Sequence, residues 1–425
     1  MLELLRKELP PTAGLPLTAA DFAAAFAGGA KGSFENALAT FLQVSDVDVL
    51  SSGTLCLSIA FEALKELTGR SRVILPGYTC PLVAIAAHAA GMEILLCDTE
   101  KNSCRMDLHI LEQICDKSIA AVVPTDIAGL PEDLSELKSI AKSYGTYVIE
   151  DAAQALGARL NGRPVGFAAD ITVFSLAVGK GLSLYDGGIL VVNDYELRAR
   201  VRAVIARRIK KAPLQNLMRQ VQLLGLSFLY NPYAMPFVYG DPLRRDLAKG
   251  DLLSAVGDHF DFDIPAYEFD ELRKRIGLSA LRRLPEFVAS NRKRALARVG
   301  GAGFQPASKT ISTGIQVLSE SPGTEGSWPF IMCLAQSTEH RDEIMSKLWG
   351  SGLGVTRLFI SELAGYEYLQ KIMPATETPN SRSFASRSFS ITNSHWLSDA
   401  DFEKIVRRAG TIKTSDSELF VGFHG

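Results

Sequence analysis

Short apolar runs alternate with stretches of helical spacing between residues 56 and 194, and this alternation constrains the fold more than any other feature of the sequence. Buried strands are predicted at residues 71–76, 92–98, 120–126, 146–151, 171–175 and 187–194. Helical spacing is found between several of them, at residues 56–67, 81–91 and 133–145. A strand followed by a helix, repeated, favours an α/β fold in which helices cover both faces of a largely parallel sheet.

The composition is that of an ordinary globular protein. The chain has 425 residues, of which 47% are apolar and 22% are charged, and its formal net charge is -2. At roughly 150 residues per domain, this length favours about two or three domains. Because the charge is balanced, we expect no basic surface for nucleic acid.

The cysteines and histidines form no recognisable metal site. The six cysteines show no CxxC pair, and the six histidines are scattered and include no HExxH sequence. We therefore expect no metal, and we expect the cysteines other than Cys80 to be small packing residues. The N-terminal sequence MLELLRKELPP lacks the apolar core and cleavage site of a signal peptide, so the expected location is the cytoplasm.

A short polar sequence follows the first predicted strand. SSGT, at 51–54, lies between the predicted strand 47–50 and a helix expected to start near Leu55. Ligands of parallel sheets bind at the carboxyl ends of the strands, where helix N-termini offer free N–H groups. Gly53 and Thr54 therefore form a candidate anion cradle. The alternative is an ordinary helix N-cap, in which the hydroxyl only completes the helix.

Two later strands end in chemically useful residues. Asp151 ends the strand 146–151 and precedes Gln154; taken alone, this carboxylate is equally an N-cap. Ser175 ends the next strand, five residues before Lys180. A buried lone ammonium is costly, so either the Lys180 stem reaches water or its amine has a chemical role at a lowered pKa. Pyridoxal phosphate requires an acid beside its ring nitrogen, hydrogen-bond donors around its phosphate and an amine that reacts with its aldehyde. The residues above supply all three, and together they indicate this cofactor.

In this order, these segments resemble those of the DegT/StrS aminotransferases. The resemblance is carried by SSGT, PGYTCP (76–81), IEDAAQALGA (149–158) and FSLAVGK with YDGG (174–188). Residues 267–295 resemble the long helix of the family, and residues 388–406 resemble its closing strand and helix. The likeness covers most of residues 33–410. It implies a fold type I enzyme that uses pyridoxal phosphate, in a family that mostly aminates nucleotide-linked keto sugars.

The resemblance implies two domains after a leading segment. We expect an N-terminal segment at 1–29, a large cofactor-binding α/β domain at 30–255 with a mainly parallel sheet between helices, and a smaller α+β domain at 256–425. The connection within 209–262 is longer than in the family. Because a second subunit usually completes fold type I sites, a homodimer is implied.

The resemblance also assigns roles to the residues at the sheet edge. Lys180 is implied to form the Schiff base with the cofactor aldehyde and then to move a proton, while Asp151 pairs with the ring nitrogen. Gln154 falls where the family contacts the ring oxygen. The positions implied to surround the phosphate are Gly53, Thr54 and Ser175.

The sequence departs from the family on the side expected to face the substrate. Cys80 replaces the usual aromatic residue that stacks on the ring, so stacking is weaker or comes from a residue such as Tyr78. Asp126 stands where many relatives have histidine. Residues 266–273 lack the asparagine that contacts the phosphate across the dimer, and residues 355–365 lack the usual His-Tyr sequence.

Two further residues are candidates for substrate binding. Arg357 is a possible clamp for a carboxylate or phosphate, and its alternative is a structural ion pair. His395 lies near the closing strand and is a candidate for the pocket wall, with a surface turn as its alternative.

Residues 221–240 form a run of twenty positions without a charge. Pro232 and Pro236 interrupt it, so we expect no transmembrane span. Its aromatic residues favour a dimer or domain interface, and contact with a membrane surface or a cover over an apolar substrate are the alternatives. The basic run at 198–211 is expected to be a solvated helix face, with support for a membrane surface as the alternative.

The expected function is transfer of an amino group from an amino acid donor, by resemblance glutamate, to a keto sugar or a related cyclic ketone. Two alternatives are open. The first is another reaction of the same cofactor, such as sugar dehydration, although dehydratases of the family typically have histidine at the position of Lys180. The second is a binding or regulatory protein that keeps the fold without catalysis.

Overall fold

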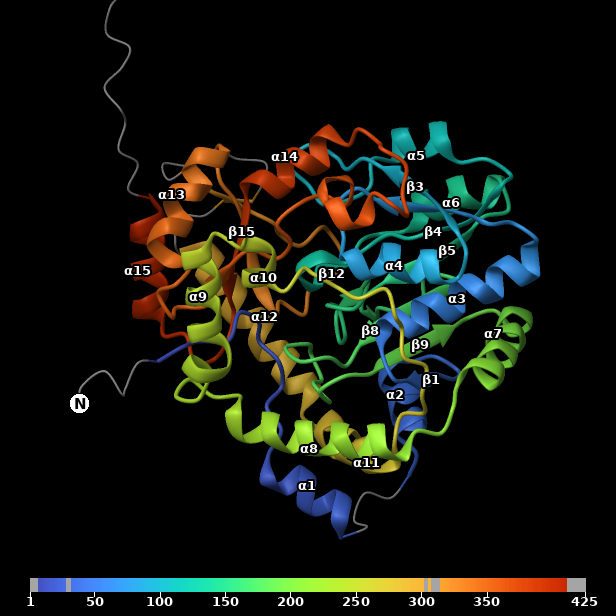
Figure 1. The fold of residues 1–425 in the computed structure, drawn as a ribbon, viewed down its shortest axis with the longest axis horizontal. Helices are drawn as coiled ribbons and strands as arrows, with labels where there is room; N and C mark the ends of the chain where they lie inside the picture. The colour runs from blue at the N-terminus through green and yellow to red at the C-terminus, as the bar shows by residue number, and fades with distance from the viewer. Residues whose placement is uncertain (1–6, 28–31, 302–304, 307–313, 411–425) are drawn as a thin grey trace, which may run out of the picture.

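The computed structural model describes residues 7–27, 32–301, 305–306 and 314–410 of the chain (Figure 1). Its large sheet has seven strands in the order β1-β9-β8-β5-β4-β2-β3. These strands are β1 (Asp48–Leu50), β2 (Arg72–Pro76), β3 (Glu93–Cys97), β4 (Ile119–Val122), β5 (Tyr147–Asp151), β8 (Ile171–Ser175) and β9 (Gly188–Val192). The neighbours from β3 to β8 are parallel, and only β9 runs antiparallel to both β8 and β1. The predicted mainly parallel sheet is confirmed.

Adjacent side chains of each strand enter different clusters on the two faces of the sheet. Val73 packs with one set of helices and Ile74 with another, and Val173 and Phe174 divide in the same way. The period of two along a strand produces this division. Because both faces are covered, β4, β8 and β9 are buried at every position, which explains why their sequences are continuous apolar runs.

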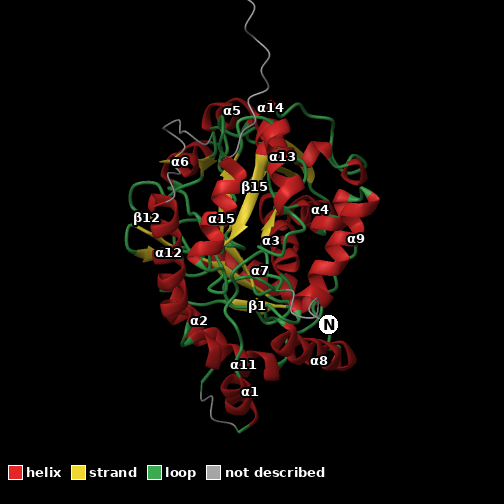
Figure 2. Cartoon of the chain, turned by 90° about the vertical axis from the view of Figure 1, so that its left-hand side faces the viewer, coloured by secondary structure: helices red, strands yellow, loops and turns green. Residues whose placement is uncertain are grey.

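Helices cover both faces of the sheet (Figures 1 and 2). One face carries α3 (Gly53–Thr68), α4 (Pro81–Ala89) and α7 (Tyr195–Arg208). The other carries α2 (Phe34–Leu42), α5 (Leu108–Ile114), α6 (Ser135–Ser143) and α11 (Glu271–Leu281). The predicted basic run falls mainly on α7, where the Arg207 and Arg208 side chains each pair with Glu62 at 2.6 Å.

The C-terminal part of the chain forms a second sheet with the order β10-β11-β13-β15-β14. Its strands are β10 (Gln305–Pro306), β11 (Gln316–Val317), β13 (Phe330–Leu334), β14 (Val355–Thr356) and β15 (Ser388–Thr392). The neighbouring helices are α12 (Leu284–Gly301), α13 (Thr338–Leu348), α14 (Pro379–Arg387) and α15 (Asp399–Gly410). The closing strand and helix predicted within 388–406 are confirmed as β15 and α15.

A small third sheet joins the two halves of the sequence. Its order is β12-β6-β7, with β6 (Arg159–Leu160), β7 (Arg163–Pro164) and β12 (Thr324–Glu325). The described residues also form short 3-10 turns at η2 (Ile127–Gly129), η4 (Leu363–Gly365) and η5 (Glu367–Leu369).

The prediction of one long helix over 267–295 is wrong. Residues 267–270 are not helical, α11 ends at Leu281, and α12 begins at Leu284. Pro285 lies at the second position of α12, where its missing N–H and its ring prevent continuation from the preceding turn. The chain therefore forms two helices with different partners, and α11 packs beside α1 (Ala19–Phe26) and α2.

The extended connection folds into helices at the periphery of the molecule. It contains α8 (Pro213–Leu229), the π-helical turn η3 (Pro236–Gly240), α9 (Asp241–Lys249) and α10 (Leu252–Val256). Both views place α8 at the lower edge of the molecule (Figures 1 and 2). Among the helices of the described residues, none is long and apolar enough to cross a membrane.

Candidate functional site

Lys180 lies in a tight loop that connects β8 to β9. The loop is closed by backbone hydrogen bonds from Leu176 to Gly187 at 2.9 Å and from Leu184 to Leu176 at 2.8 Å. Ser183 Oγ accepts from the Gly179 N–H and donates to the Lys180 carbonyl at 3.0 Å, which fixes the turn around the lysine. Backbone hydrogen bonds and one serine therefore determine where the amine is presented.

Lys180, Asp151 and Cys80 come together at the carboxyl edge of the sheet. Burial lowers the pKa of the Lys180 amine, and the neighbouring Cys80 and Asp151 act in the opposite direction. Burial raises the pKa of the Asp151 carboxyl, which the Ala153 N–H and Lys180 oppose. Among the ion pairs of the described residues there is none between Lys180 and Asp151, so the two groups interact electrostatically without contact.

The N-terminus of α3 lies beside the end of β8. Ser52 is the N-cap, and its hydroxyl accepts from the Leu55 N–H at 3.0 Å, so the helix begins at Gly53, two residues earlier than predicted. A Cβ at Gly53 would lie 3.7 Å from that of Ser175. Because Ser52 performs the capping, the Thr54 hydroxyl has no hydrogen-bond partner within the described part of the chain.

Gln154 is held with its oxygen turned into the protein. Its Oε1 accepts from the Ala128 N–H at 2.7 Å, and its carbonyl accepts from the Ser327 hydroxyl at 2.7 Å. Ala128 adopts a left-handed conformation with φ of 60°, which directs its N–H at this oxygen. The Gln154 amide N–H groups are therefore the ones available to an acceptor.

The donor set at this edge fits pyridoxal phosphate. The helix N-terminus and the Thr54 hydroxyl suit a phosphate, the Gln154 amide suits a ring oxygen, and Asp151 suits a protonated ring nitrogen. The Lys180 amine, with a lowered pKa, suits an aldehyde. These five positions come from three separate segments of the chain, each of which follows a strand of the large sheet.

The predicted substrate residues are divided between the site and the core. Tyr78 is completely buried and packs edge-on against Phe384 and Phe359, with ring centroids 4.9 and 5.6 Å away. Cys80 caps the N-terminus of α4, and burial raises the pKa of its thiol to about 12, so it stays neutral beside Lys180. Cys80 therefore borders the site, while the Tyr78 ring belongs to a core cluster of the C-terminal part.

Arg357 forms no ion pair with a carboxylate in the described residues. It is buried, and its Nη2 donates to the carbonyls of Ile360 at 2.6 Å and Ala385 at 3.0 Å. Its Nε has no partner in this part of the structure. Burial, with Arg341 nearby, lowers the pKa of its guanidinium to about 10. The alternative of a structural ion pair is therefore wrong for the described residues.

Asp126 is buried beside the Asp151 backbone. Its N–H donates to the Asp151 carbonyl at 3.0 Å, and its Oδ2 has no partner among the described residues. Burial and the nearby Glu150, Glu132 and Asp151 raise the pKa of the Asp126 carboxyl well above its ordinary value. Burial and the neighbouring carboxylates thus favour the protonated form of this side chain.

His395 is separated from the lysine loop by intervening residues. Its ring stacks on Trp396 at 4.4 Å, and Trp396 in turn contacts the ring of Tyr230. The Tyr230 hydroxyl donates to the Thr12 carbonyl at 2.8 Å. Burial, with Arg294, lowers the pKa of His395. His395 lies exposed in the turn that follows β15, so the alternative of a surface turn is confirmed.

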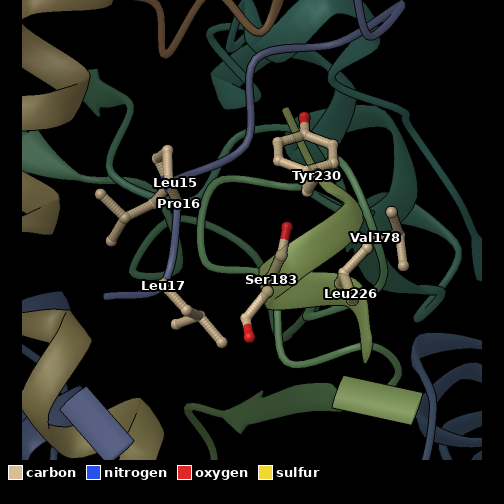
Figure 3. Close-up of a pocket in the computed structure, with 8 residues that line it drawn as sticks. Leu15, Pro16, Leu17, Val178, Ser183, Leu226 and Tyr230 are labelled. Carbon is tan, nitrogen blue, oxygen red and sulfur yellow. The ribbon is translucent and has the colours of Figure 1, made fainter. Parts of the chain in front are cut away.

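The N-terminal segment, for which no role was predicted, lies against the lysine loop. The Leu15 N–H donates to the Gly181 carbonyl at 3.1 Å, and a Cβ at Gly14 would lie 3.1 Å from the Lys180 carbonyl oxygen. Figure 3 shows Leu15, Pro16 and Leu17 facing Val178 and Ser183 across a small pocket. The sequence PPTAGLP, rich in proline, was the available signal for an extended segment.

A second group that the sequence analysis missed lies on the other side of Cys80. Asp258 Oδ2 accepts from the Tyr366 hydroxyl at 2.6 Å and from the Ile360 N–H at 2.9 Å. The Tyr368 hydroxyl donates to the Asp258 carbonyl at 2.7 Å. Asp258 and Tyr368 both interact electrostatically with Cys80, so this cluster is close to the site. No local sequence pattern joins residue 258 to residues 366–368.

The topology and the site together define the class of protein. The solved structures that this fold matches are fold type I aminotransferases, among them a sugar aminotransferase, Spr1654, from Streptococcus pneumoniae, and PseC from Helicobacter pylori. The TM-score is 0.71 for both, at 19% and 18% sequence identity. The matches cover 94% and 95% of this chain and 98% of each neighbour, so they establish the fold over nearly its whole length.

A family model narrows this class. The model of the DegT/DnrJ/EryC1/StrS aminotransferase family matches residues 21–231 and 262–409, which is most of the chain. The chain therefore belongs to this family of pyridoxal phosphate-dependent sugar aminotransferases. The unmatched residues 232–261 fall within the extended connection.

Curated relatives match over part of their length. A UDP-N-acetyl-3-dehydro-alpha-D-glucosamine 3-aminotransferase from Acidithiobacillus ferrooxidans is 34% identical over 155 residues, which are 36% of this chain and 42% of that protein. The GDP-perosamine synthase of Vibrio cholerae is 30% identical over 178 residues, 41% of this chain and 48% of that protein. The aligned part of the chain thus spans less than half the length of these two relatives.

Proposed function

We propose that this protein is a pyridoxal phosphate-dependent aminotransferase that acts on a keto sugar, by resemblance a nucleotide-linked one. The observation that carries the proposal is the placement of Lys180 beside Asp151 and Cys80 at the sheet edge, within electrostatic range but without an ion pair. Such a pair of charges is costly unless a ligand lies between them. The relatives named above, which act on nucleotide sugars by their names, support the substrate class.

Each residue at the edge has a distinct task in this proposal. When bound, pyridoxal phosphate supplies an electron sink for the pair released when a C–H bond breaks. Asp151 holds a proton at the ring nitrogen, and Asp126 lies beside its backbone. Lys180 Nζ would hold the cofactor through its aldehyde and, once free, would serve as the base and acid that moves a proton at the substrate carbon.

The remaining residues bind and orient. Thr54, Ser175 and the first N–H groups of α3 hold the phosphate, and Gln154 donates to the ring oxygen. Cys80 packs against the ring and, being small, leaves room on that side. We place the acceptor beyond Cys80, near Asp258 and Tyr366, and propose that the positive charge of Arg357 favours an acidic part of the substrate.

Absorbance of the cofactor-loaded protein tests this proposal. On addition of glutamate, the visible band of the bound aldehyde should decline as the amine is transferred, and addition of a 4-keto or 3-keto nucleotide sugar should restore it. A stable band in the presence of glutamate would favour another reaction of the cofactor. Failure to bind the cofactor would favour the non-catalytic alternative.

We further propose that the protein acts as a homodimer in the cytoplasm. The family resemblance supports the dimer, and the half-buried Lys180 and Thr54 leave the site open on one side. The six cysteines are free thiols, as expected in a reducing compartment. Light scattering after size-exclusion chromatography should give twice the mass of one chain.

A further inference from the structure

Helix α8 has its polar side turned toward the protein. Its only charged residue, Arg219, pairs with Asp186 at 2.8 Å and donates to the Tyr267 hydroxyl. Gln220 donates to Asp270 at 2.9 Å, and Asn216 is buried. A surface helix normally presents these residues to water and its apolar residues to the core. The inner side of α8 thus buries polar side chains together with Leu223, which is completely buried, and does not follow this pattern.

The outer side of α8 is apolar along its whole length. Its exposed fractions are 80% for Leu214, 56% for Leu217, 42% for Met218, 62% for Val221, 45% for Leu224 and 72% for Phe228. The spacing of three and four residues places these side chains on one face. The surface continues with Tyr233, Phe237 and Val238, which are 57%, 68% and 47% exposed. We call these nine residues the apolar ridge.

A ridge of this kind is not ordinary surface. Single exposed apolar residues are common, but contiguous patches of several hundred Å² mark a place where another apolar body binds. The inner side of the same helix is already covered: Leu226 and Tyr230 line the small pocket with Leu15 and Val178 (Figure 3). The ridge is the opposite side, and it faces away from the chain's own core.

Two exposed lysines flank the ridge. Residues 197–240 contain no aspartate or glutamate, and of their eight lysines and arginines, Arg202, Arg207, Arg208 and Arg219 pair with carboxylates elsewhere in the chain. Lys210 and Lys211, immediately before α8, are exposed and form no ion pair within the described residues. Lys7 lies over the ring of Tyr233, 5.6 Å from its centroid. On α9, beyond the ridge, Asp241 pairs with Arg244 and Asp246 pairs with Lys249.

We propose that the apolar ridge binds the surface of an anionic lipid membrane, with α8 parallel to the membrane plane. Helices of this kind insert their apolar face to the level of the headgroups and attract anionic lipids through flanking lysines. The aromatic residues Phe228, Tyr233 and Phe237 suit the headgroup region. A second protein surface is less suited, because protein interfaces carry about one hydrogen bond per 100–200 Å² and the ridge offers one hydroxyl, that of Tyr233.

Cosedimentation with lipid vesicles tests this proposal. The full chain, loaded with cofactor, is mixed with vesicles of phosphatidylcholine containing 30% phosphatidylglycerol, or of phosphatidylcholine alone, at low salt. We expect binding to the anionic vesicles, weaker binding to the neutral ones, and a further decrease at high salt because exposed charges are screened. Absence of the wild-type protein from the anionic vesicle pellet would overturn the proposal.

Substitutions separate the apolar and charged contributions. The double variant Val221→Asp/Phe228→Asp should reduce binding at least tenfold, since each removes an inserted side chain. Lys210→Glu/Lys211→Glu should reduce binding to anionic vesicles roughly fivefold per residue and have little effect on neutral ones. Tyr195→Asp is the matched control: Tyr195 is 84% exposed on α7, outside the ridge, and the substitution should change nothing.

The oligomeric state decides between a membrane and a second copy of the chain. All four proteins are compared by light scattering and by thermal unfolding, so that a misfolded variant is recognised. If the wild type is a dimer and Val221→Asp/Phe228→Asp is a folded monomer, a second copy covers the ridge and the proposal is wrong. If the variant keeps the wild-type mass and loses vesicle binding, the proposal is supported. Neither result depends on aminotransferase activity.

Discussion

The carboxyl edge of the large sheet and the outer face of α8 break the usual distribution of polarity in opposite ways. At the sheet edge, ionisable groups such as Lys180, Asp151 and Asp126 are partly or wholly removed from water. On α8, large apolar side chains such as Val221 and Phe228 are left in water. Each arrangement is costly for the isolated chain. Each therefore marks a place where a ligand or surface is expected, polar in the first case and apolar in the second.

The largest effect is expected from Lys180→Ala. If the edge exists to hold a reactive amine, this substitution should lower the rate of amine transfer by at least about 10⁴-fold, because it removes both the nucleophile and the proton carrier. Single-turnover assays with glutamate measure the loss. Circular dichroism should show an unchanged fold, since the Lys180 side chain forms no ion pair in the described residues. Substantial residual turnover would contradict the assignment.

Asp151→Asn should have the next largest effect. The amide cannot hold a proton at the ring nitrogen, so we expect the rate to fall by roughly 10²–10³-fold. Glu150→Gln is the matched control, because Glu150 is the adjacent residue of β5 and its side chain accepts from Thr172 instead of interacting with Lys180. Its rate should stay within about twofold of the wild type. Equal losses of rate in Asp151→Asn and Glu150→Gln would contradict a specific role for Asp151, because any change at the end of β5 would then have the same effect.

Glu150 also predicts a dependence of stability on pH. Burial raises the pKa of its carboxyl from 4.5 to about 7. Between these values the folded protein keeps a proton that the unfolded chain has lost, so the free energy of unfolding should decrease as the pH rises from about 5 to 8. Glu150→Gln removes this cost and should gain about 1–3 kcal/mol over the wild type at pH 8, with little gain at pH 5. Urea denaturation at the two pH values measures the free energy of unfolding of both proteins. An equal gain in stability at pH 5 and pH 8 would contradict the raised pKa of Glu150.

The smallest effects concern the two sides of α8. Arg219→Ala removes an inward ion pair and should cost about 1–2 kcal/mol of stability. Leu217→Lys changes an outward position that is 56% exposed, and its effect should stay within about 0.5 kcal/mol. Thermal unfolding of the two variants measures the asymmetry. A larger cost for Leu217→Lys would show that the outer face is packed against something within the protein itself.

The strands of the large sheet and the residues at its edge could be predicted because both follow from short, continuous stretches of the sequence. Apolar runs predicted β2 to β5, β8 and β9 to within a few residues, and a strand followed by a polar residue places that residue at the edge by geometry alone. The break at Pro285 was also readable, but the family resemblance suggested one long helix and was wrong there.

Other features depended on contacts between distant segments. The cluster of Asp258 with Tyr366 and Tyr368 spans more than 100 residues, and the N-terminal segment reaches the lysine loop from residue 15. The uncharged run 221–240 was noticed in the sequence, but the inward direction of Arg219 on α8 was not, because its Asp186 partner is distant in the chain. The composition of residues 221–240 indicates an apolar face, but only the packing of α8 shows that this face points outward.

The central claim is that the Lys180 amine binds an aldehyde at the sheet edge, opposite Asp151. Borohydride reduction of the protein incubated with pyridoxal phosphate, followed by peptide mass spectrometry, tests it most directly. We predict one modified residue, Lys180, and no modification at that site in Lys180→Ala. Modification spread over surface lysines, with Lys180 unlabelled, would contradict the account.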